Sequence, residues 1–422
     1  MITVTVFGLG FVGLTTALGF ASLGHKVYGI DVDEKRKATL REKQLPFAEP
    51  GLGTVLESQL NNNFFITDDV AEAVQNSQYI YYCVGTPYGA EGNADLSYLY
   101  AAIQTTVDSL VDGDRKPLDS VYRVLITKST IPPSTTSEKI VPFIMNMGEI
   151  SNYLGIANNP EFLREGHCWD DFINADRIVI GCEDEKVKHM MDLLYAPMDS
   201  PIFYTNFNTG EFIKYLSNTM LATLISFSNE MAHIASSIGD IEVSKAFKIL
   251  HMDKRWGGCM MTSYVYPGCG YGGYCLPKDT NALFAQSKKH GFEPTILREV
   301  IKTNDERPLV VSKEIAKVSS VNQKIGILGL SFKPMSDDVR DTPAAKIIQN
   351  LKYLGFRNII AYDPIASKEF IMRYPDVEIE IKESMEDLYE CADVICILTA
   401  WEEFKTVKTL GNKVVVDCRY ML

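Results

Sequence analysis

The chain has 422 residues, of which 46% are hydrophobic and 23% are charged, so its composition is that of an ordinary globular protein and not of a disordered, collagen-like or coiled-coil chain. At roughly 100–200 residues per domain, this length predicts two or three domains. The formal net charge of −13 argues against nucleic acid as a partner, because neutralising phosphates requires clustered Lys and Arg.

The first third of the chain alternates short β-branched runs with helical patterns, which is typical of a parallel α/β sheet. The pattern predicts strands at residues 3–7, 26–30, 79–84, 124–128, 155–157, 177–181 and 202–204. From about residue 209 to residue 250 the pattern becomes helical and lacks proline. A helix of more than about 25 residues suits a spine between domains or a dimer interface.

A glycine-rich interruption follows at residues 264–279, and a second α/β unit begins at residues 324–329. Its later strands are predicted at residues 359–362, 394–398 and 414–417. We therefore expect an α/β domain, a helical connector and a second α/β domain.

Residues 8–13, Gly-Leu-Gly-Phe-Val-Gly, fit the GxGxxG pattern of a dinucleotide-binding loop between a predicted strand and a predicted helix. The three glycines permit a tight turn, close approach of a pyrophosphate and close packing of helix on strand. Asp31 closes the next predicted strand, where a carboxylate accepts hydrogen bonds from the adenosine ribose and favours NAD over NADP. Arg36 leaves NADP open, because an arginine nearby can hold a 2′-phosphate. The alternative is a glycine-rich turn of a flavodoxin-like fold that binds nothing.

The stretch from Pro267 to Asp279 is the most informative in the chain. Four glycines in six positions precede Cys275, so the backbone of this loop can wrap closely around a ligand. Lys278 and Asp279 place a cation and a carboxylate near the thiol, and a neighbouring cation favours the nucleophilic thiolate. The alternative is a buried structural cysteine beside a surface Lys–Asp pair.

Nine cysteines are too few for a disulfide framework in a chain of this length. They form no CxxC pair and no histidine cluster accompanies them, so we predict no metal site. No apolar stretch approaches the roughly 20 residues that span a bilayer, and the N-terminus begins with a strand pattern instead of a signal peptide. We therefore expect a protein of the reducing cytoplasm that makes no membrane contact.

Seven motifs in one order resemble the nucleotide-sugar 6-dehydrogenases of the UDP-glucose/GDP-mannose dehydrogenase family over nearly the whole chain. They are the N-terminal glycine loop, Val-Gly-Thr-Pro at 84–87, Lys-Ser-Thr-Ile-Pro at 128–132, Asn-Pro-Glu-Phe-Leu-Arg-Glu-Gly at 159–166, Lys214 with Asn218, the Cys275 loop, and Gly-Leu-Ser-Phe-Lys at 329–333 followed by Arg340. The resemblance implies two Rossmann-like doubly wound α/β domains joined by a long central helix and a helical dimerisation region. It implies an NAD-binding domain at 1–205, a central dimerisation region with the cysteine loop at 206–305, and a C-terminal domain for the UDP-sugar at 306–422. A homodimer is expected.

The family oxidises the C6 alcohol of a sugar to a carboxylate with two NAD and releases no free aldehyde. An aldehyde has no hydride to donate until a nucleophile adds to its carbonyl. By resemblance Cys275 is this nucleophile, and it forms first a thiohemiacetal and then a thioester that water hydrolyses.

The resemblance also assigns catalytic roles to five polar residues. Lys214 and Asn218 are four residues apart on a predicted helix and would stabilise developing oxyanions, with Lys214 also able to act as an acid or base. Asp279 and Thr130 would hold the water used in proton transfer and hydrolysis, and Glu161 would be the general base. In isolation, the Lys–Asn pair would be read as a solvated helix face, Thr130 as a strand-end residue and Glu161 as an acid at a helix N-terminus.

The binding sites implied by the resemblance are larger. For NAD they comprise Gly8, Gly10, Phe11, Val12, Gly13, Asp31, Arg36, Thr86, Thr130, Glu165, Lys278 and Arg340. For the nucleotide sugar they comprise Glu161, Phe162, Leu163, Arg164, Glu165, Lys214, Asn218, Arg255, Tyr264, Val265, Tyr266, Pro267, Gly268, Gly272 and Lys333. In several relatives the arginine matching Arg255 reaches the substrate of the other subunit.

The substrate expected from the resemblance is UDP-glucose. Tyr274 and the Pro-Lys-Asp that ends at Asp279 argue against enzymes of UDP-N-acetylmannosamine, whereas GDP-mannose dehydrogenases share Cys-x-Pro-Lys-Asp and stay the alternative. Two other classes of protein stay as alternatives. One is a single-hydride β-hydroxyacid dehydrogenase, which needs no cysteine, and the other is a nucleotide-sugar binding protein without catalytic activity. Cys269 and His167 depart from the family pattern, and a disulfide between Cys269 and Cys275 is not expected in a reducing compartment.

Overall fold

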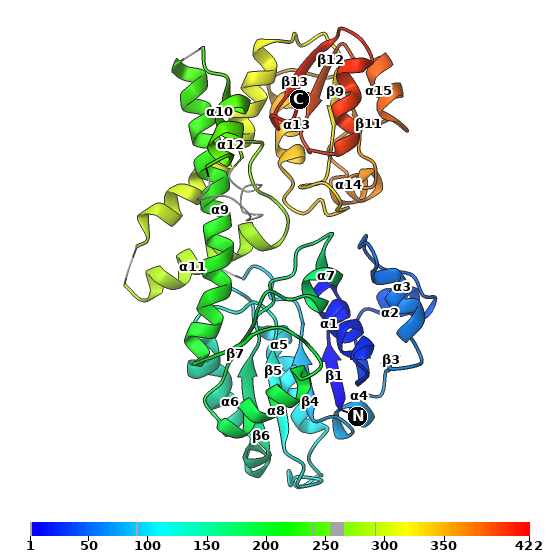
Figure 1. Ribbon diagram of the computed structural model, residues 1–422, viewed down its shortest axis with the longest axis vertical. Helices are drawn as coiled ribbons and strands as arrows, with labels where there is room; N and C mark the ends of the chain where they lie inside the picture. The colour runs from blue at the N-terminus through cyan, green and yellow to red at the C-terminus, as the bar shows by residue number, and fades with distance from the viewer. Residues whose placement is uncertain (1, 90–91, 239, 254–265, 292) are drawn as a thin grey trace. The chain divides into compact units, whose positions relative to one another are not determined.

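The computed structural model describes every residue except 1, 90–91, 239, 254–265 and 292 (Figure 1). By its internal contacts the chain divides into two compact units, residues 1–216 and 217–422. Within the described residues, each helix is too short or too polar to cross a membrane.

The N-terminal unit is built on an eight-stranded sheet in the order β3-β2-β1-β4-β5-β6-β7-β8. Its strands are β1 (Thr3–Phe7), β2 (Lys26–Ile30), β3 (Phe64–Ile66), β4 (Tyr79–Tyr82), β5 (Arg123–Thr127), β6 (Leu154–Asn158), β7 (Ile178–Gly181) and β8 (Ile202–Thr205). All neighbours are parallel except β6 and β7, which meet antiparallel at Asn158 and Gly181. The order β3-β2-β1-β4-β5-β6 is that of a dinucleotide-binding sheet, whose ligand site lies at the carboxyl ends of β1 and β4.

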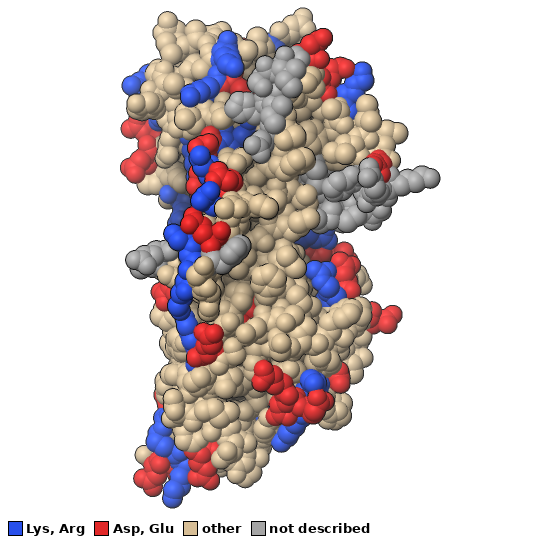
Figure 2. Space-filling view, turned by 90° about the vertical axis from the view of Figure 1, so that its left-hand side faces the viewer, with Lys and Arg blue, Asp and Glu red and all other residues tan. Residues whose placement is uncertain are grey.

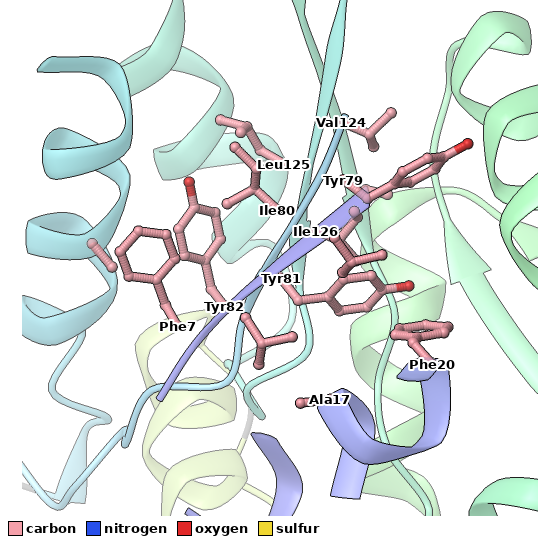
Figure 3. Close-up of a cluster of buried hydrophobic side chains, with 14 of the residues drawn as sticks. Phe7, Ala17, Phe20, Tyr79, Ile80, Tyr81, Tyr82, Val124, Leu125 and Ile126 are labelled. Atoms are coloured by element: carbon pink, nitrogen blue, oxygen red, sulfur yellow. The ribbon is translucent and has the colours of Figure 1, made fainter. Parts of the chain in front are cut away.

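Helices pack on both faces of this sheet. They are α1 (Phe11–Ser22), α2 (Glu34–Arg41), α3 (Leu52–Gln59), α4 (Val70–Gln75), α5 (Ser97–Asp108), α6 (Val141–Met145), α7 (Cys168–Ile173) and α8 (Glu185–Tyr195). In strand β4, Tyr79 and Tyr81 point to one face of the sheet while Ile80 and Tyr82 point to the other (Figure 3). All four side chains are buried, so helices must pack on both faces. The tyrosine hydroxyls bond to α8 on the first face and to Thr106 of α5 on the second.

The C-terminal unit contains a five-stranded parallel sheet in the order β11-β10-β9-β12-β13. Its strands are β9 (Ile325–Leu328), β10 (Ile359–Tyr362), β11 (Glu380–Ile381), β12 (Val394–Ile397) and β13 (Val414–Asp417), and its sheet helices are α13 (Pro343–Tyr353), α14 (Ser367–Arg373) and α15 (Met385–Cys391). This order repeats that of β3-β2-β1-β4-β5 in the other unit. The predicted fold class, with two Rossmann-like α/β units, is therefore confirmed.

The remaining helices are α9 (Phe207–Ile238), α10 (Val243–His251), α11 (Cys275–Lys289) and α12 (Thr295–Lys317). The 32-residue helix α9 contains the boundary between the two units, so the predicted long helix is present.

The helical pattern predicted over 209–250 is confirmed, and it comprises the two helices α9 and α10. Asp240 between them has a φ of 54°, which a continuing helix does not allow. One detail of the predicted connector is wrong. The expected interruption at 264–279 ends earlier, because Cys275 begins α11. Pro277 is tolerated there since the first N–H groups of a helix have no intrahelical partner.

On the face shown in Figure 2, basic and acidic side chains lie next to one another. Several of the ion pairs join residues three apart on a helix, such as Lys245 with Glu242 and Lys405 with Glu402. Exposed pairs of this kind add at most about 1 kcal/mol each to stability.

Candidate active site

The glycine loop between β1 and α1 has the backbone that the sequence motif requires. Gly8 has a φ of 86°, and a Cβ there would lie 2.7 Å from the carbonyl oxygen of Cys83. A Cβ on Gly13 would lie 1.7 Å from the carbonyl oxygen of Gly8, whereas one on Gly10 would meet nothing within 4 Å. No side chain caps α1 and no acidic residue lies in its first turn. The start of α1 is therefore open to a phosphate group.

The carboxylate of Asp31, directly after β2, is bonded by backbone N–H groups and by an arginine. Asp31 accepts hydrogen bonds from the backbone N–H of Leu9 at 2.6 Å and of Asp33 at 2.8 Å. Arg36 pairs with Asp31 at 2.9 Å and lies 3.6 Å from the carboxylate of Asp33. An arginine engaged by two carboxylates is poorly placed to hold a 2′-phosphate, so the geometry favours NAD.

The loops that follow β4 and β5 are joined to each other at the carboxyl edge of the sheet. Thr86 donates to the carbonyl oxygen of Thr130 at 3.0 Å, and Ser129 donates to that of Val84 at 2.6 Å. Thr130 also lines a hollow together with residues of β5, β6 and α9 and of the loops that follow the two strands. These residues are Thr127, Ser129, Ile131, Asn158, Pro160, Glu211 and Lys214.

Glu161 and Lys214 form a buried ion pair in this unit. Their Oε1 and Nζ atoms are 2.8 Å apart, and each side chain is 6% exposed. The second carboxylate oxygen of Glu161 accepts from the N–H of Leu163 at 2.7 Å, and the ammonium of Lys214 lies 5.8 Å from the ring centre of Phe162. The reading of Lys214 as part of a solvated helix face is thus wrong, and two predicted catalytic residues lie in contact.

Two buried titratable residues near this pair escaped the sequence analysis as candidates. Lys128 donates to the side-chain oxygen of Asn159 at 3.1 Å, and burial lowers its pKa to about 8. Glu211 accepts from the N–H and the hydroxyl of Thr136, and burial raises its pKa to about 7. Only their positions in the sequence could have indicated these two residues. Lys128 is the first residue of the Lys-Ser-Thr motif, and Glu211 lies three residues before Lys214.

In the C-terminal unit, Cys275 is exposed at the first position of α11, so it is not a buried structural cysteine. Lys278 and Asp279 follow one turn later and are buried, so they are not a surface pair. Their Nζ and Oδ1 atoms are 2.5 Å apart, and Asn218 donates to the other oxygen of Asp279. Burial alone would lower the pKa of Lys278, but the attraction of Asp279 outweighs it and raises that pKa. The structure thus joins three predicted residues, Asn218, Lys278 and Asp279.

The loop before Cys275 is packed too closely for larger residues. A Cβ on Gly268 would lie 2.4 Å from the guanidinium of Arg419, and one on Gly272 would lie 2.5 Å from the carbonyl oxygen of Asp341. Arg419 follows β13 by two residues and belongs to no motif, so it was not among the predicted residues. Cys269 is buried and its thiol is directed to Cys418, and both are free thiols.

Three further predicted residues are held by neighbours. Arg164 is paired with Asp171 at 2.5 Å, and its backbone N–H also donates to that carboxylate. Arg340 pairs with Asp338 at 2.7 Å and lies 4.7 Å from the ring centre of Tyr274. Lys333 lies 5.4 Å from the ring centre of Phe332.

The predicted residues fall into two sets. The N-terminal unit holds Gly8, Gly10, Phe11, Val12, Gly13, Asp31, Arg36, Thr86, Thr130, Glu161, Phe162, Leu163, Arg164, Glu165 and Lys214. The C-terminal unit holds Asn218, Tyr266, Pro267, Gly268, Gly272, Cys275, Lys278, Asp279, Lys333 and Arg340. Arg255, Tyr264 and Val265 lie outside the described residues.

A doubly wound sheet, an open glycine loop and an acid directly after β2 define a dinucleotide-binding protein. Residues 2–199, 208–306 and 326–422 match the NAD binding domain, the central domain and the UDP binding domain of the UDP-glucose/GDP-mannose dehydrogenase family. The chain belongs to this family and is an NAD-dependent dehydrogenase of nucleotide sugars. The alternatives of a β-hydroxyacid dehydrogenase and of a silent binding protein are therefore wrong.

Individual relatives agree with this assignment. The chain is 36% identical to UDP-glucose 6-dehydrogenase TuaD of Bacillus subtilis, over 99% of this chain and 88% of the relative. It is 33% identical to UDP-glucose 6-dehydrogenase AglM of Haloferax volcanii, over 98% and 96%. A solved UDP-glucose dehydrogenase from Pyrobaculum islandicum superimposes with a TM-score of 0.90 at 32% identity, covering 100% of this chain and 94% of that one.

Proposed function

We propose that this protein oxidises UDP-glucose to UDP-glucuronate in two steps that consume two NAD, through a thiohemiacetal and a thioester on Cys275. The main support is the exposed Cys275 at the start of α11. The buried Lys278 and Asp279 lie one turn further along this helix, and Asn218 of α9 donates to Asp279. The substrate is proposed from the relatives, several of which are named UDP-glucose 6-dehydrogenases.

NAD supplies the hydride acceptor for each of the two oxidations. In the first oxidation, a base removes the proton of the C6 hydroxyl while a hydride leaves the C6 carbon. Glu161 paired with Lys214 provides a carboxylate and an ammonium for that proton transfer. The product of this step is an aldehyde. The thiolate of Cys275 then adds to its carbonyl carbon, and the carbonyl oxygen becomes an alkoxide that takes up a proton.

The thiohemiacetal loses the second hydride from C6 together with the proton of its hydroxyl, and becomes a thioester. Water attacks the thioester carbon, the C–S bond breaks, and the carboxylate leaves while the thiol is restored. We assign the stabilisation of the oxyanions to Lys214 and Asn218. Asp279 and Thr130 would hold the water. The carboxylate of Asp279 is held in one orientation, because Lys278 and Asn218 bond its two oxygens.

We further propose that residues 1–205 bind NAD, that 306–422 bind the UDP moiety, and that 206–305 form a dimer interface. Apolar residues on α9 support the last point: Phe212, Leu216, Met220 and Phe227 are 43%, 53%, 51% and 48% exposed. Such a stripe at helical spacing marks an interaction surface. The free thiols of the described cysteines are in keeping with a reducing cytoplasm.

The test is the amount of NADH formed from limiting UDP-glucose. Two NADH per UDP-glucose, with UDP-glucuronate as product, supports the proposal. One NADH with an accumulated aldehyde contradicts it. A panel of UDP- and GDP-sugars decides the alternative that GDP-mannose or another nucleotide sugar is the substrate.

A further inference from the structure

Side chains of α9 and α12 form hydrogen bonds with the backbone of the loop before Cys275. Asn229 of α9 accepts from the N–H of Gly268, and Arg307 of α12 donates from Nε to the carbonyl oxygen of the same residue at 2.7 Å. All three residues are buried. Both polar groups of the Gly268 peptide backbone are thus bonded by side chains instead of by a strand or helix.

Asn304 of α12 does the same for Tyr271. Its Oδ1 accepts from the N–H of Tyr271 at 2.7 Å, and its Nδ2 donates to the carbonyl oxygen of Tyr271 at 3.1 Å. The side chain is 5% exposed. One amide therefore bonds both backbone groups of one residue, as a neighbouring strand would.

The glycine between these two positions fits the same arrangement. Gly270 has a φ of 106°, and a Cβ there would lie 2.8 Å from Oδ1 of Asn304. The absence of a side chain lets the loop approach Asn304 closely enough to form both hydrogen bonds. The ring of Tyr271 packs with Ala222 and Val300 in a small buried cluster, which holds the same residue from its side chain.

Tyr271 lies four residues before Cys275, and between them the N–H of Gly273 donates to the carbonyl oxygen of Arg340 at 2.8 Å. The backbone that leads to Cys275 in the first turn of α11 is therefore held by hydrogen bonds at Gly268, Tyr271 and Gly273. We propose that Asn304 is a positioning residue, which sets the place of Cys275 by holding the backbone of Tyr271. The proposal rests on the function assigned above only in so far as Cys275 is the nucleophile.

The test uses two variants of the full-length protein. Asn304→Ala removes both hydrogen bonds. Asn304→Asp keeps the acceptor for the N–H of Tyr271 but turns a second oxygen toward its carbonyl, so it replaces an attraction by a repulsion. The first measurement is the rate of alkylation by iodoacetamide at Cys275, divided by the rate at Cys391 in the same sample. Cys391 is also exposed and belongs to α15, so it controls for reagent and global unfolding.

We expect this ratio to fall at least about fivefold in both variants, because the N–H groups of a helix start favour a thiolate only while the cysteine stays in the first turn. We also expect kcat with UDP-glucose to fall about tenfold or more while the KM for NAD changes less than about twofold, since displaced reacting atoms slow chemistry more than cofactor binding. The control variant is Ser312→Ala. Ser312 is buried on the same helix and bonds to Pro308 and Ile347, so its loss tests general damage to α12.

Variants of Asn304 that match Ser312→Ala in both the alkylation ratio and kcat would overturn the proposal. If the unmodified protein does not oxidise UDP-glucose, the proposed function fails, but the alkylation ratio still decides whether Asn304 positions Cys275. If either Asn304 variant fails to fold, the other provides the same comparison.

Discussion

The Nζ atom of Lys214 and the Oε1 atom of Glu161 are 2.8 Å apart, and both side chains are almost completely buried. Removing one partner of a buried pair leaves the other charge uncompensated. Lys214→Ala should therefore lower the free energy of unfolding by about 3–5 kcal/mol, as should Glu161→Ala. The double variant should lose clearly less than the sum of the two, because neither member of the pair is then left without the other. Urea unfolding of the four proteins measures this coupling.

The matched control for this cycle is the exposed pair of Lys245 and Glu242, whose Nζ and Oε2 atoms are also 2.8 Å apart. Lys245→Ala should change the free energy of unfolding by less than about 1 kcal/mol. Additive losses at Lys214 and Glu161 would mean that the two charges do not depend on each other in solution.

Cys275→Ala should abolish formation of UDP-glucuronate, because the aldehyde then lacks the adduct from which a second hydride leaves. The measurement is product analysis by chromatography together with NADH yield. Cys391→Ala is the control, since Cys391 is the other exposed cysteine among those described. Normal glucuronate production by Cys275→Ala would exclude covalent catalysis.

Local constraints made part of this structure predictable from the sequence. Positions 8 and 13 require glycine because the backbone turns at Gly8 and packs closely at Gly13. This requirement could be predicted because it produces the GxGxxG pattern within six residues. Strands of four or five residues with β-branched and aromatic side chains were predicted close to their observed bounds. The two-residue strand β11 and the three-residue strand β3 are too short to show a period and were missed.

Contacts between distant segments were not predictable in this way. The sequence positions of Glu161 and Lys214 are 53 apart by subtraction, and only the family resemblance suggested that they share a site. Asn304 and Arg419 belong to no motif, and their contacts with the cysteine loop arise from the packing of α12 and of the segment after β13. The division between α9 and α10 was hidden because apolar spacing continues on both sides of it.

Glu211 should make the stability of the protein depend on pH near neutrality. Burial raises its pKa from 4.5 to about 7, so between these values the folded protein binds a proton that the unfolded chain has lost. Folding stability therefore falls as pH rises through this range. Glu211→Gln, which keeps the acceptor for Thr136, should remove up to about 3 kcal/mol of that fall.

The measurement for Glu211 is the free energy of unfolding of both proteins at several pH values between about 4.5 and 8. The difference between variant and parent isolates Glu211, because all other titrating groups are common to both. An equal pH dependence in the two proteins would show that Glu211 titrates normally in the fold.

Asp31→Asn should shift cofactor preference toward NADP. The amide oxygen can still accept from the N–H of Leu9, but the negative charge that holds Arg36 and repels a 2′-phosphate is gone. We expect the ratio of kcat/KM for NADP to that for NAD to rise about tenfold or more. Asp33→Asn is the control, since Asp33 lies 3.6 Å from Arg36 and makes the weaker pair. An unchanged ratio in Asp31→Asn would mean that Arg36 does not face the ribose.

Charge placed on the exposed stripe of α9 should weaken self-association. Leu216 and Met220 are about half exposed and one turn apart, so Leu216→Glu with Met220→Glu would bring two carboxylates into an apolar contact of a proposed dimer. We expect the apparent mass in sedimentation velocity to fall from that of a dimer toward the 47.2 kDa of one chain. Tyr353→Glu is the control, because Tyr353 is 90% exposed and belongs to α13 instead of α9. A dimer that survives the double substitution must use another surface, and a monomeric parent protein would refute the proposed assembly outright.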